Sequence, residues 1–488
     1  MTGDRPPAEA AGDRLLAEAA GDRPPAEAAR DRLLADAAAR ARRYLAGLDS
    51  RPVFPRAEAV AALHQLDFPL PGAGLAPEEV IELLDRVGSP ATVASAGARY
   101  FGFVTGGALP AALAAAWLSA AWDQNLATAV MSPAAARLDQ VALRWVVDLL
   151  GLPAGTSGAF VSGATMANAT CLAAARDAVL QQAGWDAAGQ GLVGAPPVQV
   201  VMGEEAHSAV AKALGLVGLG RDRAVRLPVD GQGRITPLDL PELGGPAIVC
   251  LQAGNVNSGA SDPFPALIEW ARSHGAWVHV DGAFGLWAAA CPDLAGQVTG
   301  AAGADSWATD AHKWLNTTYD CGVALVRDAA ALRAAMGSTA AYLPPGPDRD
   351  PMQFGPQASQ RARGIEVWAA LASLGRSGLA DLVGRDARLA RRFASRLAAA
   401  GFEVLNEVVL NQVVAAPGPG AGSGAPAPGN IGAFIAEVQR DGTCWCGPTV
   451  WHGRPAMRIS VSSWATTDDD VDRSVEAMVA AGRSVGGL

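Results

Sequence analysis

The chain has 488 residues, half of them apolar, with 56 glycines and 33 prolines. This length exceeds one typical hydrophobic core and predicts two or more subdomains, and the composition excludes a largely disordered chain. A net charge of −10 argues against general binding to nucleic acid or to an acidic membrane surface.

The N-terminus and the cysteines argue against a secreted or metal-binding protein. The first 40 residues contain no apolar segment of the kind found in signal peptides. Cys444 and Cys446 are closely spaced, but the sequence has no second such pair to complete a zinc site. We therefore expect no metal ion, no disulfide framework and a cytoplasmic location.

A nine-residue repeat opens the chain. GDRPPAEAA begins at Gly3 and recurs three times with small changes, ending near Ala38. Four such short copies match no known solenoid period. Two interpretations stay open: a frayed or partly helical arm, or a helix that embraces a dimer partner, the latter favoured for the last copy. We assign residues 1–38 to this arm and residues 39–95 to a helical, dimer-embracing segment.

Residues 106–122 are apolar throughout and resemble a membrane span in composition. The segment is too short for one, contains Pro110 and is followed at once by Asp123. We therefore predict a buried helix here and no membrane contact.

From about residue 96, short β-rich runs alternate with helical stretches. The predicted strands are 159–162, 198–202, 247–251, 277–280, 306–309 and 322–326, and the predicted helices between them are 165–181, 208–216 and 263–273. This alternation predicts an α/β fold with a mostly parallel sheet, in a large domain of residues 96–345. In such sheets the binding site forms at the carboxyl ends of the strands.

Residues 346–488 are predicted to form a small C-terminal α/β domain. Its predicted elements are helical stretches at 365–374 and 386–400, a strand at 402–414, a flexible loop at 417–429, shorter elements at 434–439 and 456–462, and a last helix from about Asp468.

Lys313 is the most informative residue, because the chain has only two lysines beside 36 arginines. A lysine amine can bond to the aldehyde of pyridoxal 5′-phosphate (PLP), whereas a guanidinium cannot. Asp281 ends the apolar run 276–280, where a carboxylate can pair with the pyridine nitrogen of PLP. Taken by itself, Asp281 can also be interpreted as a helix cap, and Lys313 as an ordinary surface lysine. Ala283 is small enough to lie beneath a planar ring.

Two further motifs fit the same cofactor. A strand, a small-residue turn and a helix start place the amides of Gly163, Ala164 and Thr165 where they can hold a phosphate. His207 follows another strand and can lie flat on the ring. Each motif alone also suits an ordinary helix start, but their joint order favours a PLP site. We interpret His279 as structural.

These residues resemble the group II PLP-dependent decarboxylases, which include aromatic-L-amino-acid and glutamate decarboxylases. The resemblance covers residues 40–480. Its matching blocks are Tyr44–Leu45, Arg51–Pro55, Tyr100–Phe103, Met131–Ala134, His207–Ser208, His279–Phe284, His312–Leu315, Tyr319–Cys321 and Met457–Ser460.

The resemblance implies a PLP-dependent transferase fold of type I, like that of aspartate aminotransferase, and a homodimer with active sites at the subunit interface. It implies that Lys313 bonds the cofactor, Asp281 pairs with its pyridine nitrogen and His207 stacks on its ring. Ala164 and Thr165 are the implied phosphate ligands, and His312 belongs to the same cofactor site. The implied reaction is decarboxylation of an L-amino acid to an amine and CO2.

The sequence departs from the family at several positions. Asp310 stands where the family usually has asparagine near the phosphate. Because a carboxylate repels a phosphate, we expect Asp310 to turn away and Thr309 to serve in its place. In the loop 343–354, Phe354 lies near a family tyrosine that helps return a proton to carbon. Phenylalanine there accompanies aldehyde formation in related enzymes, which makes an aldehyde synthase the alternative function.

We assign substrate contacts to Phe103, Gly106, Asn125, Phe354 and Arg458. Phe103, Gly106 and Asn125 argue against a catechol or indole substrate and favour a smaller or more polar amino acid. Arg458 has two interpretations, an anchor for a carboxylate and a structural ion pair. Two rival functions stay open: a carbon–carbon lyase or aldolase, and a silent dimeric interaction module, against which the intact set of candidate catalytic residues argues.

Overall fold

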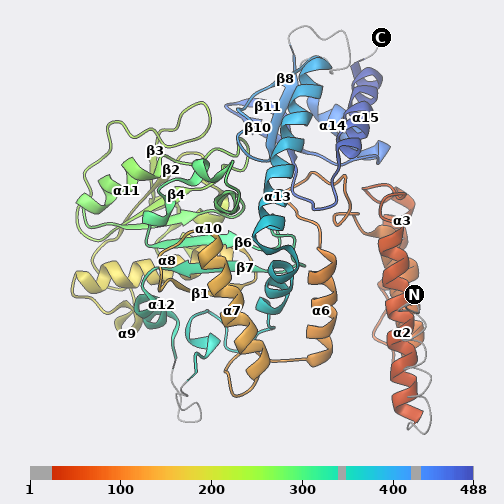
Figure 1. The fold of residues 1–488 in the computed structure, drawn as a ribbon, viewed down its shortest axis with the longest axis horizontal. Helices are drawn as coiled ribbons and strands as arrows, with labels where there is room; N and C mark the ends of the chain where they lie inside the picture. The colour runs from red at the N-terminus through yellow and green to blue at the C-terminus, as the bar shows by residue number, and fades with distance from the viewer. Residues whose placement is uncertain (1–24, 339–347, 419–429, 487–488) are drawn as a thin grey trace, which may run out of the picture. The chain divides into compact units, whose positions relative to one another are not determined.

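The computed structural model describes residues 25–338, 348–418 and 430–486 (Figure 1). The chain forms two compact units, Met1–Ala94 and Ser95–Leu488. Most of the nine-residue repeat, part of the predicted loop 343–354 and most of the predicted loop 417–429 lie outside the described residues.

The first unit is helical in its described part. Its elements are α2 (Pro25–Ala46), α3 (Ala57–Ala61), η1 (Ala62–Leu66), α4 (Pro77–Leu83), η2 (Leu84–Gly88) and α5 (Ser89–Ala91). The guanidinium of Arg40 donates to Asp36 at 2.8 Å and to Asp85 at 3.0 Å. The hydroxyl oxygens of Tyr44 and Thr92 lie 2.8 Å apart. These contacts join α2 to the segment that contains η2 and α5.

The second unit contains a seven-stranded sheet in the order β1-β7-β6-β5-β4-β2-β3. Its strands are β1 (Ser157–Val161), β2 (Gln199–Gly203), β3 (Val225–Leu227), β4 (Ala247–Gln252), β5 (Trp277–Asp281), β6 (Ser306–Asp310) and β7 (Gly322–Val326). Strand β7 runs antiparallel to the other six, which all share one direction. The mostly parallel α/β sheet predicted from the sequence is confirmed, and β3 is a short edge strand that the pattern did not indicate.

Helices cover both faces of this sheet because successive residues of a strand point to opposite sides (Figure 1). Ala159 and Val161 of β1 pack in the core with α8, α10 and α12, whereas Phe160 packs in the other core with α7, α11 and α13. These helices, with the short α9, have the bounds α7 (Pro133–Leu149), α8 (Ala164–Gln182), α9 (Ala187–Gln190), α10 (Ser208–Leu216), α11 (Phe264–Ser273), α12 (Ala329–Met336) and α13 (Gly364–Ala399).

The long helix α13 connects this sheet to a second, smaller one (Figure 1). Its first half packs in the core of the large sheet and its second half in that of the small sheet. The helix kinks at Gly375, whose φ of 63° lies in the left-handed region that favours glycine.

The small sheet is antiparallel, in the order β10-β11-β9-β8. Its elements are β8 (Phe402–Val404), β9 (Gln412–Pro417), α14 (Ile431–Asp441), β10 (Gly447–Trp451), β11 (Arg454–Ser460) and α15 (Asp468–Gly486). The single strand predicted over 402–414 is wrong, because the chain makes two strands there that pair with each other.

The apolar segment 106–122 contains the helix α6 (Pro110–Trp122), in which Ala112 is the only buried residue. Trp117, Leu118 and Trp122 are 43%, 55% and 45% exposed. The predicted burial of this helix is therefore wrong within a single chain, since apolar composition does not show which surface covers a helix. Among the described residues, no helix combines the length and the apolar character needed to cross a bilayer.

Candidate active site

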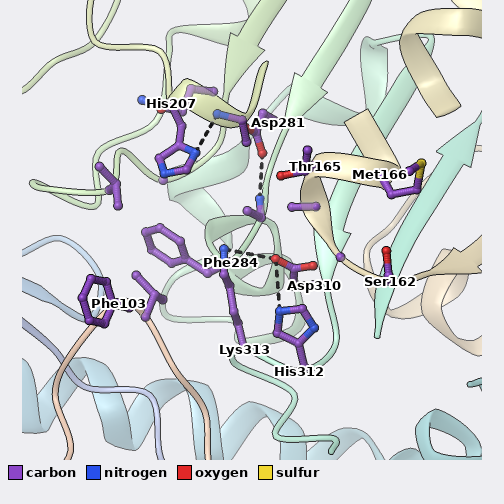
Figure 2. A pocket seen from close by; sticks show the side chains of 18 of the residues that line it. Phe103, Ser162, Thr165, Met166, His207, Asp281, Phe284, Asp310, His312 and Lys313 are labelled. Atoms are coloured by element: carbon purple, nitrogen blue, oxygen red, sulfur yellow. Dashed lines mark hydrogen bonds and ion pairs between the residues drawn. The ribbon is translucent and has the colours of Figure 1, made fainter. Parts of the chain in front are cut away.

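A cavity of about 430 Å³ lies at the carboxyl ends of β1, β5 and β6 (Figure 2). These three strands run in the same direction, so the residues that follow them meet at one edge of the sheet. The predicted site residues in its wall are Lys313, Asp281, His207, Ala283, Gly163, Ala164, Thr165, His312, Phe103 and Arg458. The predicted residues Thr309, Gly106, Asn125 and Phe354 are not part of this wall.

Lys313 projects into the cavity from the turn that follows β6 (Figure 2). Its Nζ lies 3.0 Å from Oδ2 of Asp310, and 19% of its side chain is exposed. The next two residues, Trp314 and Leu315, are fully buried. The indole Nε1 of Trp314 donates to Asp386 at 3.0 Å. The amine is therefore held by an ion pair on a turn that its neighbours anchor in the core.

The backbone around Lys313 is fixed by Asn316, which has a φ of 58°. The side-chain oxygen of Asn316 accepts hydrogen bonds from the backbone amides of Gly107 at 2.7 Å and Trp464 at 2.9 Å. A Cβ atom on Gly106 would lie only 1.9 Å from the carbonyl oxygen of Lys313. Gly106 therefore packs against the lysine backbone, which explains why the sequence has glycine there.

Asp281 and His207 lie across the cavity from Lys313 (Figure 2). Burial raises the pKa of the Asp281 carboxyl, while His207, Lys313 and the side-chain amide of Asn168 counteract that shift. Burial also lowers the pKa of His207. The Nδ1 atom of His207 accepts a hydrogen bond from the amide of Ala209 at 3.2 Å, so a neutral His207 carries its proton on Nε2.

His279, two residues before Asp281 on β5, belongs to a buried hydrogen-bond chain. Nε2 of His279 lies 2.8 Å from Oδ1 of Asn168, and Nδ1 lies 2.9 Å from the hydroxyl of Ser306. Because an amide oxygen only accepts, His279 donates through Nε2, and this orients the Asn168 amide. Sequence analysis predicted the structural character of His279 but missed Asn168, whose only signal was its place in the first turns of a helix that follows the small-residue turn.

The small-residue turn at the start of α8 forms another side of the cavity. Its backbone amides lie at the N-terminus of a 19-residue helix, where the helix dipole favours an anion. A Cβ atom on Gly322 would lie 2.5 Å from the Gly163 backbone, so strand β7 approaches this turn closely. The turn is therefore held against the sheet, next to β6 and its lysine loop.

Asp310 differs from its predicted orientation. It lines the cavity and contacts Lys313, whereas we expected its carboxylate to turn away. Two buried oxygens at the end of β6, Oδ1 of Asp310 and Oγ1 of Thr309, have no hydrogen-bond partner among the described residues. Unpaired buried oxygens are costly, and they point to a polar group that the protein alone does not supply.

Arg458 and Phe103 form the side of the cavity nearest the small sheet. Arg458 is largely buried, and burial lowers its pKa. Its Nη1 donates to the carbonyl oxygen of Val256 at 3.3 Å, and it forms no ion pair in the described part of the chain. The ring of Phe103 lies 5.2 Å from that of Trp445. Phe103 and Val104 both have left-handed backbone, with φ of 54° and 55°, which is unfavourable for bulky and β-branched residues.

Asn125 and Phe354 lie away from this cavity within one chain. The amide of Asn125 bonds Ser359 at 3.3 Å and Gln360 at 3.2 Å. The guanidinium of Arg349 lies 4.0 Å above the ring of Phe354. Both residues therefore have structural partners of their own.

These residues fit a bound PLP. The cavity offers an amine, a carboxylate across from it, a helix N-terminus for an anion and a histidine ring in the wall. Lys313, Asp281, His207 and the turn Gly163–Thr165 are the groups that would hold the cofactor.

The sequence matches known proteins over most of its length. Residues 80–415 match the family model described as Pyridoxal-dependent decarboxylase conserved domain. A phenylacetaldehyde synthase of Arabidopsis thaliana is 26% identical over 364 residues, which cover 70% of this chain and 73% of the plant protein. Tryptophan decarboxylase 1 of Oryza sativa subsp. japonica is 28% identical over 397 residues, or 75% and 76% of the two chains.

Solved structures share the fold. The crystal structure of Oryza sativa TDC with PLP and tryptamine has a TM-score of 0.86 at 24% identity and covers 96% of this chain and 100% of that one. Mouse CSAD in its apo form has a TM-score of 0.85 at 23% identity and covers 93% and 99%. The expected type I fold is confirmed.

The His279 chain generates a pH-dependent prediction. Burial lowers the pKa of His279 to about 3, from 6.5. Between these values the unfolded chain binds a proton that the folded chain excludes, so stability falls as pH falls. We expect wild type to lose about 2 kcal/mol more stability than His279→Gln between pH 7 and pH 5, measured by urea unfolding.

His274→Gln is the matched control for this measurement. Hydrogen bonds to Trp270 and Glu242 raise the pKa of His274, so its removal should shift the pH dependence in the opposite direction. Equal pH dependence of wild type and His279→Gln would contradict the assignment of a neutral, buried His279.

Proposed function

Because this chain belongs to the pyridoxal-dependent decarboxylase family, we propose that it decarboxylates an L-amino acid and releases the amine and CO2. The family match covers more than half of the chain, and the protein is a PLP-dependent carboxy-lyase. What we propose is the kind of amino acid that it takes as substrate and the product that it releases.

The observation that carries the proposal is the position of Lys313 in the same cavity as Asp281 (Figure 2). PLP supplies an electron sink for the bonds around the α-carbon of an amino acid. Lys313 would supply the amine that holds the cofactor through its aldehyde. Asp281 would pair with the pyridine nitrogen and keep it protonated. The amide of Ala283, which donates to Asp281, and the nearby His207 and Lys313 favour the carboxylate against burial, which raises its pKa.

His207 and the turn at α8 position the cofactor in this proposal. A neutral His207 lies against the ring without adding a second positive charge beside Asp281 and Lys313. Gly163, Ala164 and Thr165 bind the phosphate through the helix start. His312 supports the turn, since its Cε1 would lie 3.3 Å from a Cβ atom on Gly163. Thr309 is buried beside this region. Its unpaired hydroxyl is the observation that supports it as a phosphate ligand.

Arg458 is the proposed anchor for a carboxylate of the substrate. It is a largely buried guanidinium in the cavity wall that donates to the carbonyl oxygen of Val256. An arginine in this state gains a strong, charge-assisted contact when a carboxylate arrives. Together with Gln252 in the same wall, it favours a small or polar amino acid over a large aromatic one. Phe103 closes the apolar side, and Gly106 acts on the site through its packing against the Lys313 backbone.

The alternative function is an aldehyde synthase, which loses CO2 and forms an aldehyde. Two relatives favour this alternative: the phenylacetaldehyde synthases of Arabidopsis thaliana and of a Rosa hybrid cultivar. Phe354, which motivated this alternative in the sequence, contacts Arg349 and does not supply further support for it.

We also propose that the protein acts as a cytoplasmic homodimer, with residues 39–95 embracing the partner. The apolar side chains exposed on α6 support a partner surface, since exposed patches of this kind mark association sites. Sedimentation velocity is expected to give twice the mass of one chain. The charged variant Trp117→Glu should shift the protein toward monomer, and a monomeric wild type would contradict the proposal.

The covalent link to Lys313 can be tested sharply because the only other lysine is Lys212. Lys212 lies on α10 and is not part of the cavity wall. Borohydride reduction of the PLP-loaded protein, followed by peptide mass spectrometry, should label Lys313 alone. Lys313→Ala should lose the visible absorbance of bound PLP, and Lys212→Ala should keep it. Label on Lys212, or none, would contradict the role of Lys313.

Product analysis separates the two candidate reactions. The purified enzyme should be incubated with each of the twenty amino acids, with CO2, amine, aldehyde and H2O2 measured together. We expect CO2 and amine in equal amounts, without peroxide, because Phe354, which motivated the oxidative alternative, is not part of the cavity wall. Aldehyde with peroxide would establish the alternative, and absence of CO2 would favour a lyase or a silent protein.

A further inference from the structure

Asp310 is a buried carboxylate that the proposed reaction does not use. It ends β6, and 2% of its side chain is exposed. Its Oδ2 contacts the amine of Lys313 at 3.0 Å, and Nε2 of His312 lies 3.7 Å from the same oxygen. Its other oxygen, Oδ1, has no hydrogen-bond partner among the described residues. Such an oxygen is expected to gain a hydrogen-bond partner when the site is filled.

The free oxygen of Asp310 faces the turn that starts α8. A Cβ atom on Gly163 would lie 3.7 Å from Oδ1 of Asp310. Figure 2 shows the carboxylate between Lys313 on one side and Ser162 on the other. Under the proposed function, this turn binds the phosphate of the cofactor, so Asp310 and that phosphate share one small space.

The charges around Asp310 do not neutralise a second anion there. Asp281 on β5 is a further acid, and Lys313 is the cation that contacts Asp310. Burial lowers the pKa of both His207 and His312, so neither supplies a stable positive charge at neutral pH. Burial raises the pKa of Tyr319, which stacks on His312 and stays neutral.

Arg458 is the remaining cation in the cavity wall, and it is bonded to Val256 near the small sheet. A phosphate at the turn therefore meets the Asp310 carboxylate, with the Lys313 amine and the partial positive charge of the helix start to offset both groups. Like charges in a buried site raise the free energy steeply, and a proton placed between them removes the repulsion.

We propose that Asp310 couples binding of the cofactor phosphate to uptake of one proton. The carboxylate takes this proton from solvent, and the resulting O–H group donates from Oδ1 to a phosphate oxygen. No bond other than the new O–H bond forms, and Lys313 keeps its contact through Oδ2. A carboxyl group that donates to a phosphate anion makes a short, charge-assisted hydrogen bond. The inference rests on the proposed function because it takes the turn as a phosphate site.

The test uses the full-length protein freed of cofactor and pyridoxine 5′-phosphate, which has the ring and the phosphate but no aldehyde. Isothermal titration calorimetry in two buffers of different ionisation enthalpy counts the protons exchanged per ligand bound. The variant Asp310→Asn keeps the shape, and its amide donates without a proton. Wild type should take up about one proton more than Asp310→Asn at pH 8.

Affinity gives a second readout. The ratio of the dissociation constants of wild type and Asp310→Asn should grow with pH, by up to about tenfold per pH unit. Titration of the phosphate of the free ligand is common to both proteins and cancels in this ratio. Pyridoxine, which lacks the phosphate, should show a ratio that does not vary with pH.

The outcomes separate this inference from the proposed function. If both proteins bind pyridoxine 5′-phosphate with equal proton uptake and a constant affinity ratio, the role of Asp310 is wrong and the phosphate site stands. If neither protein binds the ligand, both the site and the inference fail. If Asp310→Asn does not fold, wild-type binding without proton uptake at pH 8 still contradicts the proposal.

Discussion

The ion pair between Lys313 and Asp310 is the interaction on which the site depends. An ammonium group in a cavity with limited exposure needs a partner, because an unpaired buried charge costs several kcal/mol. The pair also fixes where the amine lies, since Asp310 belongs to β6 and the lysine turn is locked by Asn316. The position of the amine is therefore set by the sheet and not by a flexible side chain alone.

The parallel order of β5 and β6 brings the second acid to the same cavity. Asp281 and Asp310 end neighbouring strands. Asp310 contacts Lys313, and Asp281 lies across the cavity from it. On the same strand as Asp281, neutral His279 bonds the side-chain oxygen of Asn168 in the core. The start of α8 adds a site for an anion. The resulting cavity has separate places for an amine, a ring nitrogen and a phosphate.

Much of this site is predictable from the sequence, and the reason is local. Lys313, Asp281, His207 and Gly163 each follow a strand within a few residues, and parallel strands deliver such residues to one edge. The orientation of Asp310 was not predictable, because it depends on an ion pair formed after folding. The packing of Gly106 against the lysine turn, the Asn168 amide and the exposure of α6 likewise depend on neighbours distant in sequence.

The central claim is that one cavity holds PLP between Lys313, Asp281 and the turn at Gly163. An experimental structure of the PLP-loaded protein tests it most directly. The account predicts continuous density from the Lys313 amine to the cofactor, with the pyridine nitrogen at hydrogen-bond distance from Asp281 and the phosphate at the start of α8. A cofactor bound elsewhere, or in this cavity without contact to Lys313, would contradict it.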